Sequence, residues 1–216
     1  MDEMSPTPRP QFERLLPVQE DALKEVFNIG SGQAATTLAE ALGVKVLVSV
    51  PAIGISPVEE VLSSLAKPAT PVVSLVNIFA GDISGCTVWL MPGDQAKDFA
   101  HLCWHHMPQS RKRAEFDFGR IHREISDCLT GAYLNTVENM LGLMTVPSTP
   151  MLMSGVMRAV LEKILSERSQ GTGAVAFVQN KFTMGEKPHS HVGFFMMVPD
   201  FDSLKRMLEI LKVAEY

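Results

Sequence analysis

The chain has 216 residues, of which 46% are hydrophobic and 20% are charged, a composition typical of a globular protein with a buried core. Nineteen basic and 24 acidic residues give a net charge of -5, which argues against general binding to nucleic-acid phosphates. The three cysteines, Cys86, Cys103 and Cys128, are far apart and odd in number, which argues against a disulfide framework and favours a reducing compartment.

Residues 1–16 are predicted to form a flexible arm, because Pro6, Pro8 and Pro10 cannot join a helix or a central strand. This segment lacks the basic region and the apolar core of a signal peptide. No apolar run in the chain approaches the roughly 18 residues that are needed to span a bilayer. We therefore expect a cytoplasmic protein without membrane insertion.

A long helix is expected over residues 18–42. Pro17 suits the start of its first turn, and Glu20 and Asp21 place acidic groups near the positive end of the helix. Apolar residues follow at spacings of mostly three and four, which predicts one buried stripe. Gly43 favours the end of the helix at this point.

Shorter elements are expected next, from runs of branched apolar residues and from turn residues. They are a strand at 44–50 that Pro51 ends, a short helix at 58–66, a hairpin of strands 72–79 and 84–91 around Gly81-Asp82, and a helix that begins after Pro92. The segment 107–113, with Pro108 and three basic residues, is expected to be a connector.

The pattern of the first half then recurs. A shift of 99 residues aligns residues 21–66 with residues 120–165 without a gap. The identical pairs are Glu25/Glu124, Gly32/Gly131, Thr37/Thr136, Leu42/Leu141, Gly43/Gly142, Ser49/Ser148, Pro51/Pro150, Val61/Val160 and Leu62/Leu161. The second half is also expected to end like the first, with strands 174–182 and 191–198 and a helix at 202–213.

Neither half alone has enough helices to cover both faces of its strands. We therefore expect an α/β (α+β) fold in which residues 17–216 form one domain with an internal pseudo-twofold duplication. Repeat one would span about 17–107 and repeat two about 114–216, with a shared β-sheet flanked by two long helices. The alternative is coincidental similarity between two amphipathic helices.

Polar residues and glycines interrupt the first long helix. Asp21, Glu25 and Asn28 fall on one helix face. Gly30 and Gly32 follow, and each costs about 1 kcal/mol relative to alanine in a helix interior. Such glycines indicate close approach to the backbone, either by a ligand or by a neighbouring helix. From spacing alone, Glu25 and Asn28 are more typical of a solvated helix face than of a functional site.

The segment Asp21-Ala-Leu-Lys-Glu25-Val-Phe-Asn28-Ile-Gly-Ser-Gly32 resembles the motif of the CheC/CheX/FliY family of chemotaxis phosphatases. That motif is an Asp or Ser, three residues, Glu, two residues, Asn, 22 residues, and Pro, which here is Pro51. CheC-type members contain the motif twice in a pseudo-symmetric α/β domain, so the resemblance covers most of the chain as a CheC-like, two-motif protein.

The resemblance implies hydrolysis of the phosphoryl-aspartate of a CheY-like response regulator, with Glu25 and Asn28 as catalytic residues. Asn28 is a neutral amide that cannot act as a general base but can hold a water in line with the phosphorus. A magnesium ion and a lysine would come from the phosphorylated partner, so no metal or cofactor bound by this chain is expected. Glu25 would pair with that lysine, Asp21 would orient the partner, and Pro51 would shape the strand end.

The second copy of the motif departs from the pattern. Its positions are occupied by Arg120, Glu124, Asp127 and Pro150. Asp127 lacks the amide N–H donors and adds negative charge beside an anionic phosphoryl group. Arg120 is placed to pair with Asp127 or with Glu124 on the helix surface. We therefore expect one competent site in the first half and a weakened or inactive one in the second.

A non-catalytic alternative stays open, in which a CheC-like binding module docks a response regulator or the receptor deamidase CheD. Other chemistry has weaker support. His101 and His105 have the spacing of metal ligands on a helix, but histidines at such positions more commonly lie on a solvated helix face or in a loop, and the same holds for His189 and His191. Cys128 is more typical of a half-buried helix residue than of a nucleophile. Met196 and Met197 are expected in the core.

Overall fold

The computed structural model describes residues 14–65, 69–107, 115–186 and 190–214. Most of the expected arm at 1–16, nearly all of the connector at 107–113, and His189 lie outside the described residues.

The first half contains a long helix, two short strands, a short helix, a hairpin and a closing helix. They are α1 (Pro17–Leu42), β1 (Val46–Val48), β2 (Ala52–Pro57), α2 (Val58–Leu65), β3 (Pro71–Gly81), β4 (Gly85–Pro92) and α3 (Gly93–His106). The second half has the same order of elements. They are α4 (Phe118–Leu141), β5 (Thr145–Pro147), β6 (Met151–Val156), α5 (Met157–Arg168), β7 (Ala174–Met184), β8 (His191–Pro199) and α6 (Phe201–Ile210).

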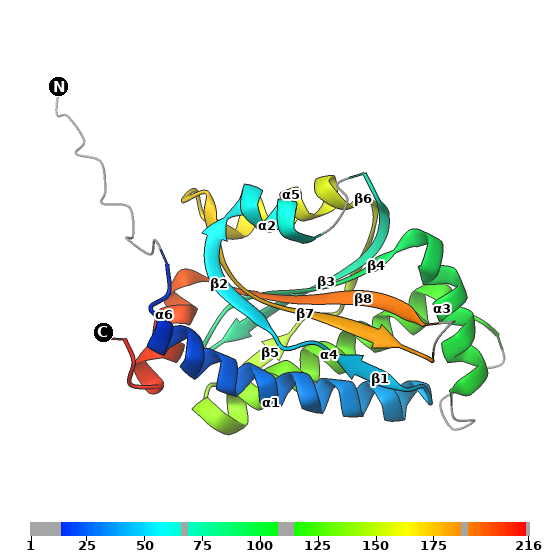
Figure 1. Cartoon of the computed structure of the whole chain (residues 1–216), viewed down its shortest axis with the longest axis horizontal. Helices are drawn as coiled ribbons and strands as arrows, with labels where there is room; N and C mark the ends of the chain where they lie inside the picture. Colours follow the sequence, from blue (N-terminus) through cyan, green and yellow to red (C-terminus); the bar gives the residue numbers. More distant parts are fainter. Residues whose placement is uncertain (1–13, 66–68, 108–114, 187–189, 215–216) are drawn as a thin grey trace.

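All strands join one antiparallel sheet in the order β1-β7-β8-β4-β3-β5, with β2 also on β7 and β6 also on β3. The first strands of each half therefore pair with the hairpin of the other half. Figure 1 shows the curled sheet with α1 and α4 on one face and α2 and α5 on the other. The predicted α/β fold, with one sheet flanked by two long helices, is confirmed.

The sheet separates two apolar layers. The larger core lies between the sheet and the helices α1, α3, α4 and α6, and includes Phe27, Trp89 and Tyr133. The smaller core lies under α2 and α5, and includes Leu161 and Met196. Both Met196 and its neighbour Met197 are buried, as expected.

The first helix ends as predicted. Gly43 has the left-handed φ of 66° at the C-terminal cap of α1, and its N–H donates to the carbonyl of Ala39. A Cβ at this position would lie 2.6 Å from the backbone oxygen of His106. Glycine is therefore required here both by the turn and by the close approach of α3.

Strands β2 and β6 are absent from the elements that the sequence predicts, which end the first strand at Pro51 and include no strand between residues 142 and 157. In the structure, Val48 pairs with Phe182 and Ala52 pairs with Gln179, so residues 49–51 lie opposite only residues 180–181. This is a β-bulge with one extra residue, and it lets the strand continue past a proline that cannot donate to the ladder. Residues 148–150 form the corresponding bulge opposite residues 77–78.

A buried histidine connects α3 with α4. His122 on α4 is fully buried, and its Nε2 lies 3.1 Å from the backbone oxygen of Ala96 on α3. The ring packs against Phe118, with centroids 4.6 Å apart. Burial lowers the pKa of His122, because the charged imidazolium would lose its hydration.

This burial predicts an acid-sensitive stability. Below the ordinary histidine pKa of about 6.5, the unfolded chain binds a proton that folded His122 does not, so the free energy of unfolding falls as the pH is lowered. The contribution of one such group is at most about 1.4 kcal/mol per pH unit. We expect His122→Leu to flatten the change in the urea midpoint between pH 7 and pH 5.

His105→Leu on α3, where the side chain is exposed, controls for the replacement of a histidine by leucine. Equal pH dependence in His122→Leu and the wild type would contradict this account.

Candidate active site

The first motif lies on the outward face of α1. Asp21, Glu25 and Asn28 are exposed, whereas Val26 and Phe27 on the opposite face are buried in the larger core. In the described part of the chain, no hydrogen bond or ion pair engages the side chain of Glu25 or Asn28. A carboxylate and an amide one turn apart are thus both open to a partner.

The two glycines after Asn28 have different surroundings. A Cβ at Gly30 would lie 3.4 Å from Oγ1 of Thr136 on α4, so this glycine allows close packing of α1 on α4. A Cβ at Gly32 would have no neighbour within 4 Å. Helix packing therefore explains Gly30, and leaves Gly32 on an open surface beside the motif.

The motif proline lies in the first bulge. Pro51 is buried, whereas the preceding Val50 is 72% exposed. Ser49 forms two hydrogen bonds with Lys181 on β7. Its N–H donates to the carbonyl of Lys181 at 2.9 Å, and its Oγ accepts from the N–H of Lys181 at 3.0 Å. The bulge thus presents the side chain of Val50 outward, between Ser49, which is bonded to β7, and the buried Pro51.

The second motif is engaged within the chain. Arg120 forms an ion pair of 2.8 Å with Glu124 one turn later, which is one of the two pairings that the sequence left open. Asp127 Oδ1 lies 3.5 Å from Nδ2 of Asn77 on β3, at the long end of hydrogen-bond distances. Pro150 is buried, as Pro51 is.

The charge of Asp127 is disfavoured where it lies. Partial desolvation of its carboxylate raises the pKa of Asp127, the hydrogen bond from Asn77 opposes this, and the nearby charge of Glu124 adds to it. The second motif therefore combines a paired glutamate with a partly desolvated aspartate, whereas the first combines an open glutamate with a neutral amide.

Two buried asparagines are functional candidates that the sequence analysis did not identify. Asn77 on β3 and Asn180 on β7 are both fully buried and both bond the backbone of a bulge. Asparagine is depleted in strands and costly to bury without partners, so its occurrence at matching places in two apolar strands was the available signal.

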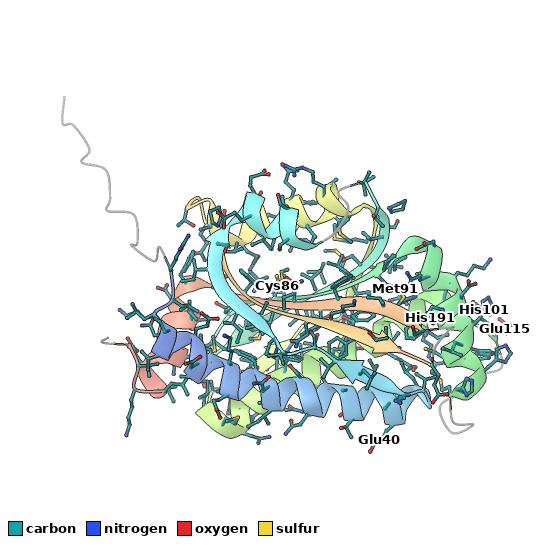
Figure 2. The ribbon with its side chains drawn as sticks, viewed as in Figure 1. Glu40, Cys86, Met91, His101, Glu115 and His191 are labelled. Atoms are coloured by element: carbon teal, nitrogen blue, oxygen red, sulfur yellow. The ribbon has the colours of Figure 1, made fainter. Side chains whose placement is uncertain are left out.

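The remaining candidates do not form a site among the described residues. Figure 2 shows His101 and His191 at the end of the molecule that α3 forms. The ring of His101 stacks on Phe116, with centroids 4.2 Å apart, and Cys103 is buried, which raises the pKa of its thiol. Cys128 is half-buried.

No group of three or more His, Cys, Asp or Glu side chains within the described ranges is placed to hold a metal ion. In the same ranges, no helix has both the length and the apolar character that crossing a membrane requires.

Comparisons with known proteins agree with the motif. Residues 18–55 match the profile of the CheC-like family. A relative from Bacillus subtilis (strain 168), named CheY-P phosphatase CheC, is 28% identical over 203 residues, which cover 89% of this chain and 93% of the relative.

Solved structures share the fold. Thermotoga maritima FliY superposes with a TM-score of 0.65 at 19% identity, covering 93% of this chain and 99% of FliY. The FliM middle domain from H. pylori superposes with a TM-score of 0.57 at 10% identity, covering 91% of this chain and 99% of that domain. The resemblance that was inferred from Asp21, Glu25, Asn28 and Pro51 is thereby confirmed.

The raised pKa of Asp127 predicts that removing its charge stabilises the protein at neutral pH. A raised folded-state pKa contributes stability below the unfolded value of about 3.9, and that contribution is lost as the pH rises through the folded value. We expect Asp127→Asn to raise the free energy of unfolding at pH 7 by less than about 1 kcal/mol, because the residue is exposed, and to raise the urea midpoint accordingly. The gain should shrink at pH 4.

The same substitution at Asp98, which is exposed on α3, controls for the loss of a surface charge. A lower midpoint for Asp127→Asn at pH 7, or a gain that is equal at both pH values, would show that Asp127 does not titrate in this way.

Proposed function

We propose that this chain, whose residues 18–55 match the CheC-like family, is a phosphatase that hydrolyses the phosphoryl-aspartate of a CheY-like response regulator. Its role would lie in chemotaxis or in related two-component signalling. The activity in the name of the B. subtilis relative supports the reaction, and the intact first motif supports its place on α1.

The observation on which the proposal depends is the state of Glu25 and Asn28. Both are exposed, lie one helical turn apart, and have no side-chain partner in the described part of the chain. A side chain without an internal partner can contact a docked protein without first breaking another interaction. The corresponding Glu124 has such a partner in Arg120.

The chemistry needs positioning more than covalent participation. Water attacks phosphorus, the bond between phosphorus and the aspartyl oxygen breaks, and the products are inorganic phosphate and a free carboxylate. Phosphoryl transfer has a loose transition state, so in-line orientation of the water accounts for much of the acceleration. Asn28 can provide this orientation, because its amide both donates and accepts hydrogen bonds.

Charge neutralisation would come from the partner. We propose that the phosphorylated receiver brings the magnesium ion and a lysine, and that Glu25 pairs with that lysine to set the docking register. Asp21, a further turn toward the N-terminus of α1, would add a second acidic contact. Pro51 would contribute through the shape of the bulge.

The second motif is proposed to be inactive as a phosphatase site. Asp127 offers neither an amide donor nor a neutral surface for an anionic phosphoryl group. Glu124 would first have to leave Arg120, although a surface pair of this kind is worth only a few tenths of a kcal/mol. The missing amide and the added charge are therefore the larger obstacles.

We expect Glu25→Ala/Asn28→Ala to abolish the acceleration of phosphate release from a magnesium-bound, phosphorylated CheY-type receiver. Asn28→Ala alone should reduce the rate by about 10- to 100-fold, because orientation of the water is lost. Release of inorganic phosphate is measured with wild type and variants at equal concentration.

Glu40→Ala is the control on the same helix, since Glu40 is exposed near the far end of α1 (Figure 2). Full activity in Asn28→Ala together with loss of activity in Asp127→Ala would place the site in the second half instead. No acceleration by the wild type with any receiver from the same genome would favour the binding module.

Restoring the second motif should create activity. In an Asn28→Ala background, we expect Arg120→Ser/Asp127→Asn to raise phosphate release measurably above that of Asn28→Ala alone. The first change frees Glu124 from its ion pair, and the second restores an amide where Asn77 can still bond it. Release that stays at the Asn28→Ala level would show that more than these two residues disables the second motif.

A further inference from the structure

The bulge that contains Pro51 is held by a third hydrogen bond, which comes from inside the protein. Nδ2 of Asn180 donates to the backbone carbonyl of Ser49 at 2.9 Å. The N–H and Oγ of Ser49 are already bonded to Lys181, so every polar group of this residue has a partner. A bulge leaves part of the ladder unpaired, and the amide of Asn180 provides the missing partner.

The amide oxygen of Asn180 is connected to the motif helix α1 through Tyr133. Oδ1 of Asn180 accepts a hydrogen bond from the hydroxyl of Tyr133 on α4. That hydroxyl also lies 2.9 Å from Oγ of Ser31, which is three residues after Asn28 on α1. The ring of Tyr133 stacks on Phe27, the residue before Asn28, with centroids 6.1 Å apart.

We propose that Asn180 is a positioning residue for the first site, linking the bulge at Ser49–Pro51 to the helix that presents Asn28. The inference rests on the proposed function and adds to it a residue outside the family motif. Asn180 is 1% exposed and does not contact the partner itself. Its two amide atoms bond Ser49 and Tyr133, so they connect the bulge, through Tyr133, to Ser31 on the motif helix.

The physical reason is the sensitivity of an in-line attack to small displacements. A shift of about 1 Å in a positioning group can cost about 100-fold in rate. Strand pairing resumes only at Ala52, so without Asn180 the carbonyl of Ser49 would lose its partner and the bulge would be held only by the two hydrogen bonds between Ser49 and Lys181.

The second half contains a matched arrangement. Asn77 donates to the carbonyl of Ser148 at 3.1 Å, and Ser148 bonds Ile78 through its N–H at 2.7 Å and its Oγ at 3.0 Å. Oδ1 of Asn77 accepts from Ser126 on α4 at 2.7 Å. Replacing Asn77 therefore removes comparable buried hydrogen bonds from the protein without touching the first site.

The experiment compares Asn180→Ala with Asn77→Ala in the full-length chain. Phosphate release from the phosphorylated, magnesium-bound receiver gives kcat and KM, and urea unfolding gives stability. We expect similar losses in urea midpoint for the two variants. Only Asn180→Ala should lower kcat, by at least about tenfold, with KM changed by less than about threefold, because docking is kept and orientation is lost.

Tyr133→Phe provides a milder variant, because it keeps the ring and removes only the hydroxyl that bonds Asn180 and approaches Ser31. We expect kcat to fall by about three- to tenfold. Amide hydrogen exchange gives a readout independent of activity: Asn180→Ala should speed exchange at Val50 and Ala52, and Asn77→Ala should speed it at Thr149 and Met151 instead.

Equal kcat values for Asn180→Ala and Asn77→Ala, with the wild type active, would overturn the positioning role and leave the proposed function standing. A wild type that does not accelerate phosphate release would overturn the proposed function, and the positioning role with it.

Discussion

Each half of the chain pairs its first two strands with the hairpin of the other half, and the rest of the structure depends on this exchange. Strands β1 and β2 lie on β7, and β5 and β6 lie on β3. Strands left without these partners would bury unpaired N–H and C=O groups, which is costly. The exchange also brings α1 and α4 together over one face of the sheet, where Gly30 allows their close contact.

The exchange has a consequence for the motif. A single motif draws its helix from one half and the strand that supports its proline from the other. Asn180, in the second half, bonds Ser49 beside Pro51 in the first, and Asn77 bonds Ser148 in the reverse direction. A site built in this way exists only in the complete fold.

The two motifs share a backbone arrangement and differ in side chains. An extra charge about 4 Å from a phosphoryl group costs about 4 kcal/mol at an effective dielectric constant of 20. The pair of Arg120 with Glu124, on a partly exposed helix surface, is worth a few tenths of a kcal/mol. For the proposed function, Asp127 in place of an asparagine is therefore the larger difference between the two motifs.

Much of the local structure could be predicted from the sequence, because helix periodicity, turn residues and caps act over a few residues. The boundaries of α1, with Pro17 at its start and Gly43 after its end, were of this kind. The face shared by Glu25 and Asn28 followed from spacing alone. Strands β2 and β6 were missed because their pairing resumes after a proline, which only a bulge against a distant partner permits.

The sequence by itself determined most of the elements, the motif and the difference between its two copies, because these depend on residue type and on short spacings. The tertiary structure decided which groups are free and which are engaged. It leaves the side chain of Asn28 open. It also joins residues that are far apart in the chain, through the contact of Asp127 with Asn77 and the hydrogen bonds of Asn180 with Ser49 and Tyr133. Such contacts form only when packing brings the segments together, so no local pattern in the chain encodes them.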